Sequence, residues 1–529
     1  MYKVSNQMPL QNYEIISPAD NQTNFLAGQV IRFTIPRSVG FWDAHNSNLR
    51  LEVAVENMNY KMAFVDSVSS LIDMIRVSQN GTTILETTNY ATLNKLIKDY
   101  TESLSLKQRR AVQDGAVDYI VQYDPGVGTG WNPPDNGAKT VTNGCLHGQS
   151  LNADASTSID NSAKNCKFEL NLEGIGVMNL KELVPSIVLG DLLIEIRLVA
   201  QNEDALKVLP STKSVVKIKA ASIGTGTTNL VIEPKEFVGF TCLADSPYAI
   251  GQVIRFVDNT PDVLDGADHP ITALSQDNDN GEITITFGTA TDGTEDPSNK
   301  FVITKGTDGN EAVKADTRFV VKRADLQLRV VRPPAQYIEA MTKKVVSEGL
   351  EIDIPVYTAY QATVQSAIKQ QTIEIPSFVS RAQAVLSVPR IQNAPAFTNN
   401  GETDRNLNGQ YKNLKNYRWQ IGETYYPNVP VELDQFLGGL HFSAQHIVEL
   451  EKALNASQLP VRSLLKTKQN FILGRALAKH GASVNLDAGL RIYLEYNDVT
   501  NPDVPLDVVS FVRHINRIVV GEQGLTVLA

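Results

Sequence analysis

Cysteine is scarce in this chain of 529 residues, and its pattern excludes a covalent or thiolate-bound framework. The three cysteines, Cys145, Cys166 and Cys242, are an odd number, and no two of them have C-x-x-C spacing. We therefore expect a protein that folds in a reducing compartment, without a disulfide scaffold or a thiolate zinc site.

Long hydrophobic runs are also missing. No stretch approaches the roughly 20 continuous apolar residues that a membrane helix needs. The first 24 residues lack the apolar core of a signal peptide, so we do not expect export by that route. On this expectation the sequons at Asn21, Asn80 and Asn455 never meet the glycosylation machinery.

Catalytic signatures are absent as well. The chain has no G-x-x-x-x-G-K-[ST] phosphate loop, no H-E-x-x-H zinc helix and no G-x-S-x-G nucleophile elbow. The glycine-rich run at 126–130 precedes Trp131 and two prolines instead of a helix, which favours a flexible loop. We predict no catalytic residue, no cofactor-binding residue, no metal ligand and no cofactor, and hence a protein that is not an enzyme.

Two groups of residues have metal-ligand chemistry but unsuitable spacing. Asp277, Asp279 and Glu282 resemble part of a calcium loop, yet position twelve of that count is Gly288, which supplies no carboxylate. A turn at 280–281 leading into a strand explains the same residues. His441 and His446 are five residues apart at the start of a predicted helix, so they fall on different faces and are expected to be capping or interface residues.

What the chain does contain is a duplicated β-rich pattern. Residues 30–56 run from an Ile-Pro step at 35–36 through a short loop into an alternating strand, and residues 372–390 do the same from 375–376. Each copy later reaches a similar strand, at 190–200 and at 488–497. The duplication predicts two like domains in one mainly β chain.

Between these landmarks the sequence predicts a few simple elements. Residues 72–86 read as a hairpin that turns at Asn80-Gly81, and 89–100 as an amphipathic helix lying across a sheet. Residues 123–165 form a long loop. Residues 213–322, with 16 acidic and 10 basic residues, form an inserted acidic subdomain whose strands are SVVKIKA, GQVIRFV, EITITF and FVVKR. A second helix is expected at 442–457, and the last residues form a β-prone tail that pairs with a sheet edge.

Several segments together resemble a known family. They are the Ile-Pro strand, IDMIRVSQNGTTILETTNYATLNKLIKDY at 72–100, ADLQLRVVRPPAQYIEAM at 324–341, and YRWQIGETYYPNVPVE at 417–432. In this order they resemble the double jelly-roll major capsid proteins of eukaryotic DNA viruses, particularly virophages and Polinton-type elements. The Asn-His-Pro segment typical of the giant-virus branch is missing.

The resemblance covers both modules but not the segment at 213–322, which its own strands and turns mark as an inserted β subdomain. Together they predict a fold class: mainly β, with two tandem eight-stranded jelly rolls, a few short helices and an inserted β subdomain. The expected domains are an N-terminal arm at 1–24, a first jelly roll at 25–212, the inserted tower at 213–322, a connecting strand and helix at 323–349, a second jelly roll at 350–515, and a C-terminal tail at 516–529.

The function that the resemblance implies is structural. Three chains would form a pseudo-hexagonal capsomer that tiles an icosahedral virion shell, synthesised and assembled inside the host cell. Expected partners are the other chains of a homotrimer, neighbouring capsomers, minor capsid and penton proteins, and a host receptor at the outer loops. An acidic chain, with a net charge of −10, is poorly suited to wrapping DNA.

Two basic segments are open to either of two interpretations. Residues 461–481 carry Arg462, Lys466, Lys468, Arg475 and Lys479 with no acidic residue. They either face an internal membrane or the genome, or match acidic neighbours in the lattice, and we favour the second interpretation. The cluster Lys107, Arg109 and Arg110 is treated in the same way.

Other functions stay open at this point. One is a glycan-binding or carbohydrate-active β-sandwich, because this fold hosts both. Hydrolysis would need paired carboxylates in an aromatic cleft, and Glu423 beside Tyr425 and Tyr426 is the one tempting cluster. A minor capsid or spike protein would assemble as pentamers or fibres instead of trimers.

Overall fold

The structure is a computed structural model. It describes residues 10–20, 22–56, 62–103, 106, 110, 113–115, 166–172, 176–180, 183–208, 216–217, 228–232, 253–256, 268–277, 282–288, 300–305, 316–392, 407, 409–433, 435–436, 439–440, 444–459, 461, 471–478, 482–499, 502, 504–521 and 524–528. Cys145, Cys242 and the whole of the predicted loop at 123–165, including the glycine-rich run at 126–130, lie outside these residues.

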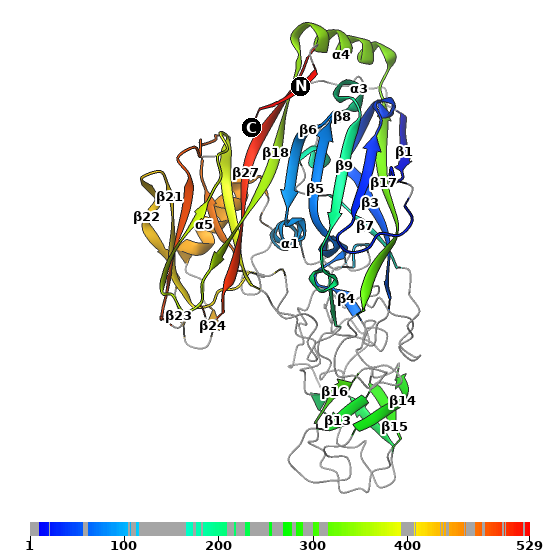
Figure 1. The fold of residues 1–529 in the computed structure, drawn as a ribbon, viewed down its shortest axis with the longest axis vertical. Coiled ribbons are helices and arrows are strands. Elements are labelled where there is room, and N and C mark those ends of the chain that lie inside the picture. Colours follow the sequence, from blue (N-terminus) through cyan, green and yellow to red (C-terminus); the bar gives the residue numbers. More distant parts are fainter. Residues whose placement is uncertain are drawn as a thin grey trace.

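The first domain, here called the first roll, is a pair of facing antiparallel sheets (Figure 1). One sheet has the order β1 (Leu10–Ile16), β17 (Arg318–Arg332), β3 (Phe41–Glu56) and β7 (Cys166–Leu170), and β8 (Val184–Pro185) also pairs with β3. The other has the order β2 (Val30–Ile35), β9 (Leu192–Leu198), β5 (Ile72–Gln79) and β6 (Thr82–Thr88).

The second roll repeats this arrangement. Its first sheet has the order β18 (Leu350–Val364), β27 (Leu506–Gly521), β20 (Ala382–Ile391) and β25 (Leu473–Ala476), and β28 (Gly524–Leu528) also pairs with β27. Its second sheet has the order β19 (Gln370–Ile375), β26 (Leu490–Tyr496), β21 (Leu414–Ile421) and β22 (Thr424–Glu432).

The two rolls have the same topology. If the eight main strands described in each roll are counted along the chain, both rolls have one sheet in the order 1-8-3-6 and one in the order 2-7-4-5. This is the strand order of a jelly roll. The sequence-based prediction of two tandem eight-stranded jelly rolls is confirmed.

The Ile-Pro steps mark the same place in both rolls. In β2 the burial alternates, with Ile31, Phe33 and Ile35 inside, as a half-buried strand requires. Pro36 and Pro376 follow the last residues of the second strands, β2 and β19, because proline has no N–H to extend the pairing. The predicted late strands are β9 and β26, and each pairs with the Ile-Pro strand of its own roll.

The predicted hairpin is formed by β5 and β6. Asn80 and Gly81 have φ values of 47° and 83°, and this pair of positive angles is what a two-residue type I′ turn demands. The chain then enters α1 (Tyr90–Thr101), which lies between the fifth and sixth strands of the first roll. The second predicted helix, α5 (Ala444–Ala456), occupies the same topological position in the second roll.

The remaining elements are short or connect the rolls. A third longer helix, α4 (Ala335–Glu348), joins β17 to β18 across one end of the molecule (Figure 1). The short elements are η1 (Arg37–Val39), η2 (Val68–Leu71), η4 (Gly176–Asn179), η5 (Asn202–Asp204), α3 (Ser186–Leu189), and the pairs β4 (Met62–Phe64) with β10 (Leu206–Val208) and β23 (Gln435–Phe436) with β24 (Gly439–Leu440).

The insertion falls between the seventh and eighth strands of the first roll. Its described strands form one sheet in the order β11 (Val216–Lys217), β16 (Lys300–Lys305), β13 (Val253–Phe256), β14 (Asp268–Gln276), β15 (Ile283–Phe287) and β12 (Asn229–Ile232). Figure 1 shows β13 to β16 beyond the end of the first roll that is farthest from α4.

Three predicted boundaries differ from the structure because pairing partners lie far away in the sequence. FVVKR, assigned to the insertion that ends at 322, belongs to β17, which bulges yet continues along β3. Part of the arm predicted at 1–24 is β1, which pairs with β17 more than 300 residues later. The tail predicted from 516 begins inside β27, and its last strand, β28, pairs with β27 of its own chain.

The two long strands β18 and β27 contribute to both hydrophobic cores. At the ends nearer α4 they complete the core of the first roll through Ile354, Val356, Ile518 and Val520. Farther along they line the core of the second roll through Val364, Leu506, Val508 and Val512. The rolls therefore share one continuous ribbon and are not two independently packed units.

Candidate functional site

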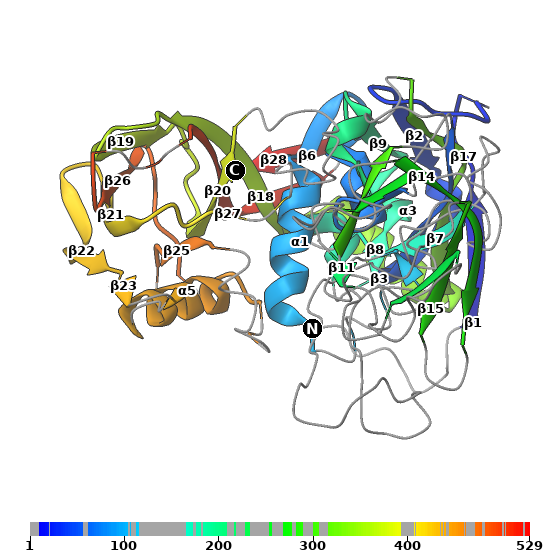
Figure 2. The ribbon, with the colours of Figure 1, turned by 90° about the horizontal axis from the view of Figure 1, so that it is seen from below.

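Outside the two cores, the described residues form an extensive buried contact at the junction between the rolls. The helix α1 lies at the centre of this junction (Figure 2). The apolar face of α1 packs against the outer face of the β18–β27–β20 sheet and against α5. The cluster consists of Leu93, Leu96, Ile97, Tyr100, Tyr357, Leu386, Val388, Leu450, Ala453, Leu454, Ile472, Val509 and Phe511. The predicted amphipathic helix does lie on a sheet, but the sheet belongs to the other roll.

Hydrogen bonds between the rolls fix the position of this apolar layer. The hydroxyl of Thr87 in β6 donates to the carbonyl of Tyr357 in β18 over 2.9 Å. The amide of Asn516 in β27 donates to the carbonyl of Ile84 over 3.0 Å. Each bond satisfies a polar group in a buried position, where an unpaired group would be costly.

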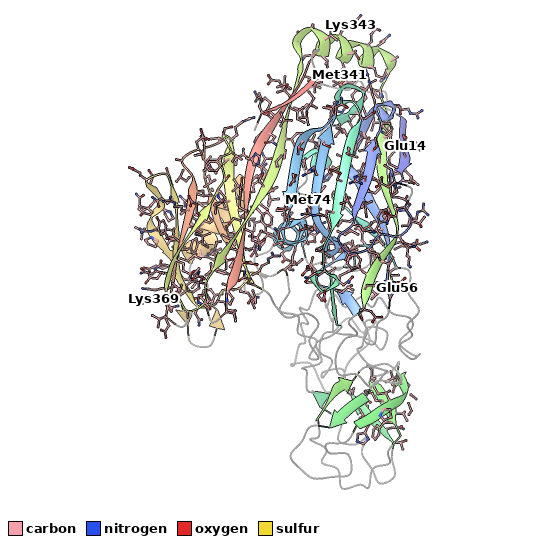
Figure 3. All side chains as sticks on the ribbon, viewed as in Figure 1. Glu14, Glu56, Met74, Met341, Lys343 and Lys369 are labelled. Carbon is pink, nitrogen blue, oxygen red and sulfur yellow. The ribbon has the colours of Figure 1, made fainter. Side chains whose placement is uncertain are left out.

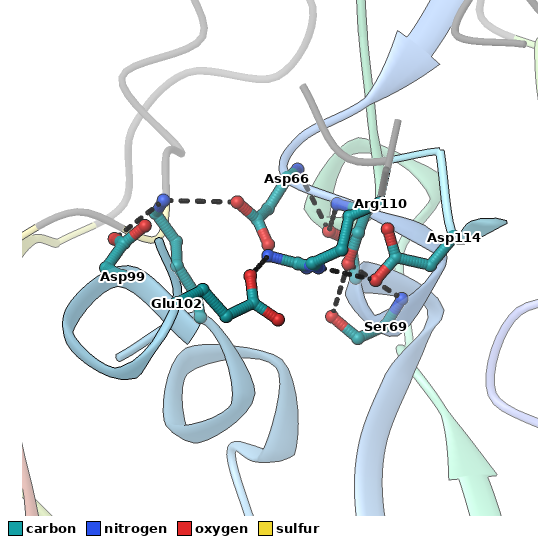
Figure 4. Close-up of polar contacts among 9 residues, drawn as sticks. Asp66, Ser69, Asp99, Glu102, Arg110 and Asp114 are labelled. Atoms are coloured by element: carbon teal, nitrogen blue, oxygen red, sulfur yellow. Dashed lines mark hydrogen bonds and ion pairs between the residues drawn. The ribbon is translucent and has the colours of Figure 1, made fainter. Parts of the chain in front are cut away.

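The polar face of α1 is buried too, and its charges are compensated by a network of ion pairs (Figure 4). The ammonium of Lys95 lies 3.1 Å from a carboxylate oxygen of Asp66 and 3.0 Å from one of Asp99. Burial alone would lower the pKa of Lys95, but the two carboxylates outweigh it and the pKa lies above its usual value. Lys95 is therefore held as a cation inside the protein.

Arg110 extends the network. Its Nε donates to Asp114 over 2.8 Å, and its Nη1 donates to Glu102 over 3.2 Å. Burial opposes the charge, yet the carboxylates of Asp114, Glu102 and Asp66 raise the pKa of Arg110 above its ordinary value. Arg110 is buried and paired within the chain, so both interpretations of the basic cluster, which placed it on the surface, are wrong for this residue. Lys107 and Arg109 lie outside the described residues.

A cavity of about 370 Å³ opens beside the junction. Arg390 of β20 crosses its wall and donates to the hydroxyl of Thr92 over 2.8 Å and to the side-chain oxygen of Asn89 over 3.2 Å. Burial lowers the pKa of Arg390, and the carboxylates of Asp507, Asp204 and Asp73 oppose that shift. Through these two hydrogen bonds, Arg390 connects the second roll to the N-terminal end of α1.

The sequence has no detectable relatives among known families or curated proteins, whereas the fold is similar to that of solved structures. No protein-family model matches the sequence, and no curated protein matches it. Among solved structures, the Faustovirus major capsid protein matches 98% of this chain and 92% of its own, at a TM-score of 0.52 and 9% identity.

Two further structures overlap with lower scores. The mavirus major capsid protein covers 100% of this chain and 91% of its own at 8% identity and a TM-score of 0.47. A chain from the Sputnik virophage structure covers 100% and 89% at 9% identity, also with a TM-score of 0.47.

The fold is a double jelly roll. The strand order of both rolls and the full-length similarity to the Faustovirus protein agree on this, and they confirm the fold that the resemblance implied. At 9% identity the similarity concerns the fold alone.

The histidines that the structure describes do not form a metal site. His446 is buried, its Nδ1 lies 2.9 Å from the hydroxyl of Tyr417, and its ring stacks on Phe471 at a centroid distance of 5.1 Å. Burial lowers the pKa of His446 to about 4, so the ring is neutral at pH 7. It is a core residue instead of the predicted capping or interface residue, and His441 lies outside the described residues.

Of the basic segment at 461–481, the structure describes Arg475 among the five cations. Its guanidinium forms an ion pair with the buried carboxylate of Glu449 in α5. Arg475 therefore fastens α5 to β25 within the chain. The acidic partner of Arg475 is thus internal, and it is not the lattice neighbour of the interpretation that we favoured.

Asp277 and Glu282, which were compared with a calcium loop, lie at the connection between β14 and β15. The backbone N–H of Asp277 donates to the carbonyl of Glu282 over 2.9 Å, which closes the connection between β14 and β15. Among the residues described, no group of three or more histidine, cysteine, aspartate or glutamate side chains is placed to hold a metal. Asp279 lies outside the described residues.

The aromatic cluster considered for glycan binding is occupied. The guanidinium of Arg418 lies over the ring of Tyr425, 4.0 Å from its centroid, and 5.3 Å from that of Tyr493. A sugar would need a ring face of this kind for stacking, and the cation already covers one. Glu423 and Tyr426 are exposed nearby at the β21–β22 hairpin.

No described helix has both the length and the apolar content needed to cross a membrane.

Proposed function

We propose that this protein is a major capsid protein whose chains trimerise into pseudo-hexagonal capsomers that tile an icosahedral virion shell. The observation that carries the proposal is the buried junction, because it joins two rolls of identical topology into one block. Similarity of fold to the Faustovirus major capsid protein supports the same conclusion.

The geometry suits this role for a simple reason. Two similar rolls in each chain give a ring of three chains six similar lobes, and six lobes fill a position in a hexagonal lattice. Such a tile must be rigid, since its lobes carry the contacts to neighbours. A shared strand ribbon, a buried helix and a buried ion network at the junction are what rigidity within one chain requires.

The two ends of the molecule differ, as the outer and inner surfaces of a shell require. The described strands of the insertion stand beyond one end of the first roll, and α4 lies at the other end (Figure 1). We assign the insertion to the outer surface as a tower, where its acidic surface is solvated and its loops are available to a host receptor. The end with α4 then faces the interior of the virion.

Mass measurement of the purified protein by gel filtration with light scattering tests the proposal. The expected species has about three times the 58.0 kDa mass of the chain, and electron microscopy of it should show a three-fold particle with a hexagonal base. A protein that stays monomeric at high concentration refutes the proposal. Pentamers or fibres would identify a minor capsid or spike protein instead.

A further inference from the structure

The two hydrophobic cores are separated on the shared ribbon by a short polar stretch. Alternate residues of β27 point to one face, where Val512 belongs to the core of the second roll and Ile518 to that of the first. Between them the same face carries His514 and Asn516, which are 3% and 7% exposed. The ribbon therefore passes from one core to the other through two buried polar side chains.

Both strands of the ribbon and the first roll contribute to this stretch. Thr358 of β18 brings its hydroxyl to 2.9 Å from Nε2 of His514. The amide of Asn516 donates to the carbonyl of Ile84 in β6, the strand of the first roll that lies beside β18 (Figure 1). We call the side chains of Thr358, His514 and Asn516 the polar seam. The seam connects β18, β27 and the first roll.

The hydrogen bonding of the polar seam is incomplete. Nδ1 of His514 and Oδ1 of Asn516 are buried, and neither atom has a hydrogen-bond partner in the part of the chain that the structure describes. A buried polar atom without a partner lowers stability, and a neutral imidazole leaves one such nitrogen here. A protonated ring would bring two N–H donors and a full charge into the same place, which costs far more.

The charge next to His514 on β27 has the same sign as a protonated ring. Arg513 is buried, and its guanidinium donates to the carbonyl of Ala456 over 3.4 Å. Burial lowers the pKa of His514 to about 4 from its ordinary 6.5; the side chain of Asn516 opposes that shift and the charge of Arg513 adds to it. His514 is therefore neutral at pH 7.

The carboxylates that could compensate a protonated His514 already have other partners. The strands in contact with β27 near this residue are β6, β18, β20 and β28, and neither β20 nor β28 contains an acidic residue. The acidic residues of β6, β18 and β27 are all paired: Glu86 with Arg76, Glu351 with Arg517, Asp353 with Arg381 and Arg517, and Asp507 with Gln361 and Thr363.

We propose that the polar seam is an acid-sensitive latch between the two rolls. While His514 is neutral, the seam stays closed and keeps the hydrogen bond from Asn516 to the first roll. Protonation places an uncompensated charge at the seam, and water must enter to solvate it, so the ribbon opens there before either core unfolds.

The direction of the pH dependence follows from burial. The open form takes up a proton more readily than the closed form, so the latch is closed above pH 6.5 and loosens as the pH falls toward 4. The inference does not depend on the proposed trimer, because every group of the seam belongs to one chain.

Hydrogen exchange of the full-length protein, converted to protection factors at each pH, tests the latch. If His514 regains its ordinary pKa in the open form, protection of the amides at 512–518 and at 84–87 should fall about 20-fold between pH 7 and pH 5. Amides of β26, inside the second roll, should keep their protection. An equal loss in β26 would mean that the whole roll unfolds, and it would overturn the latch.

Two variants and a matched control assign the effect to His514. His514→Gln keeps a neutral polar side chain that does not titrate, so the protection of its seam should be the same at both pH values. Thr358→Asp places a carboxylate beside Nε2, which favours the charged ring, so the fall in protection should shrink or reverse. His446→Gln removes a second buried histidine whose pKa is also about 4, and this control should retain the full fall.

Four results would overturn the proposal. They are equal protection of the seam at pH 7 and pH 5 in the unmodified protein, a fall in protection that persists in His514→Gln, an unchanged fall in Thr358→Asp, and the loss of the fall in His446→Gln.

Discussion

Replacing Lys95 by methionine should destabilise the junction far more than the same replacement on the surface. Lys95 is the shared cation of Asp66 and Asp99, and all three side chains are buried. Methionine keeps the unbranched shape and a good helix propensity, so the change isolates the loss of charge. Two carboxylates would then remain buried without the cation that compensates them.

The expected magnitude follows from that uncompensated charge. Breaking a buried ion pair by removing one partner typically costs about 3–5 kcal/mol. For a cooperative unit of about 150–250 residues, each kcal/mol shifts the unfolding midpoint by about 2–4 °C. The midpoint of the Lys95→Met variant is therefore expected to fall by on the order of 10 °C.

Differential scanning fluorimetry with a matched control provides the assay. Lys343→Met removes the partner of Glu339, an i,i+4 pair 3.0 Å apart on the exposed surface of α4, and Figure 3 shows Lys343 at the tip of the molecule. Screened surface pairs contribute little, so the midpoint of this control should hardly move. Adding Asp66→Asn and Asp99→Asn to Lys95→Met should recover much of the loss. Equal shifts for the Lys95 and Lys343 variants would refute the buried-network argument.

Three further predictions concern other contacts. Gly176→Ala places a methyl group against the backbone and a side chain of β18, so it should cost about 1–3 kcal/mol in a thermal melt, whereas Gly288→Ala meets open space and should not. Burial lowers the pKa of His446 in the folded state to about 4 from its ordinary 6.5, so unfolding takes up a proton between these pH values. Stability should be full above pH 6.5 and fall by roughly 3 kcal/mol toward pH 4, and His446→Gln should flatten that slope in a pH series of melts. Arg475→Met leaves the buried carboxylate of Glu449 without this partner, so hydrogen exchange in α5 should become faster while exchange in α1 stays unchanged.

Local pattern was enough to predict the repeated framework. The Ile-Pro steps, the hairpin at Asn80-Gly81 and the alternating late strands each have a signal within about ten residues, and each is found at its predicted place. The duplication added the decisive information, since two copies of a weak pattern in the same order define a topology better than one copy does.

Long-range pairing was not predictable in the same way. β1 looked like part of an arm because its partner, β17, follows more than 300 residues later, beyond the insertion. The start of β17 was assigned to the insertion for the same reason. Nothing in LQNYEII indicates which distant strand it pairs with, because antiparallel pairing leaves no local signature in either strand.

The burial of α1 and its charged side chains at the junction between the rolls was not predicted from the sequence. The charged residues of α1 suggested a solvated face, as Lys95 and Asp99 normally would. The fold buries them because Asp66 and Arg110, from the segments before and after α1, supply the matching charges. Arg110 in turn seemed a surface cation for lack of any sign in the sequence that Asp114 and Glu102 converge on it.

The shared ribbon has a consequence for how the chain is made. A nascent chain cannot close the first core when β17 is complete at Arg332, because Ile518 and Val520, which complete that core near α4, belong to β27 and are translated after the other main strands of the second roll. Prematurely terminated products keep apolar surface open and are prone to aggregation before they reach an assembly site. The first roll therefore acquires a closed core only after β27 has been translated.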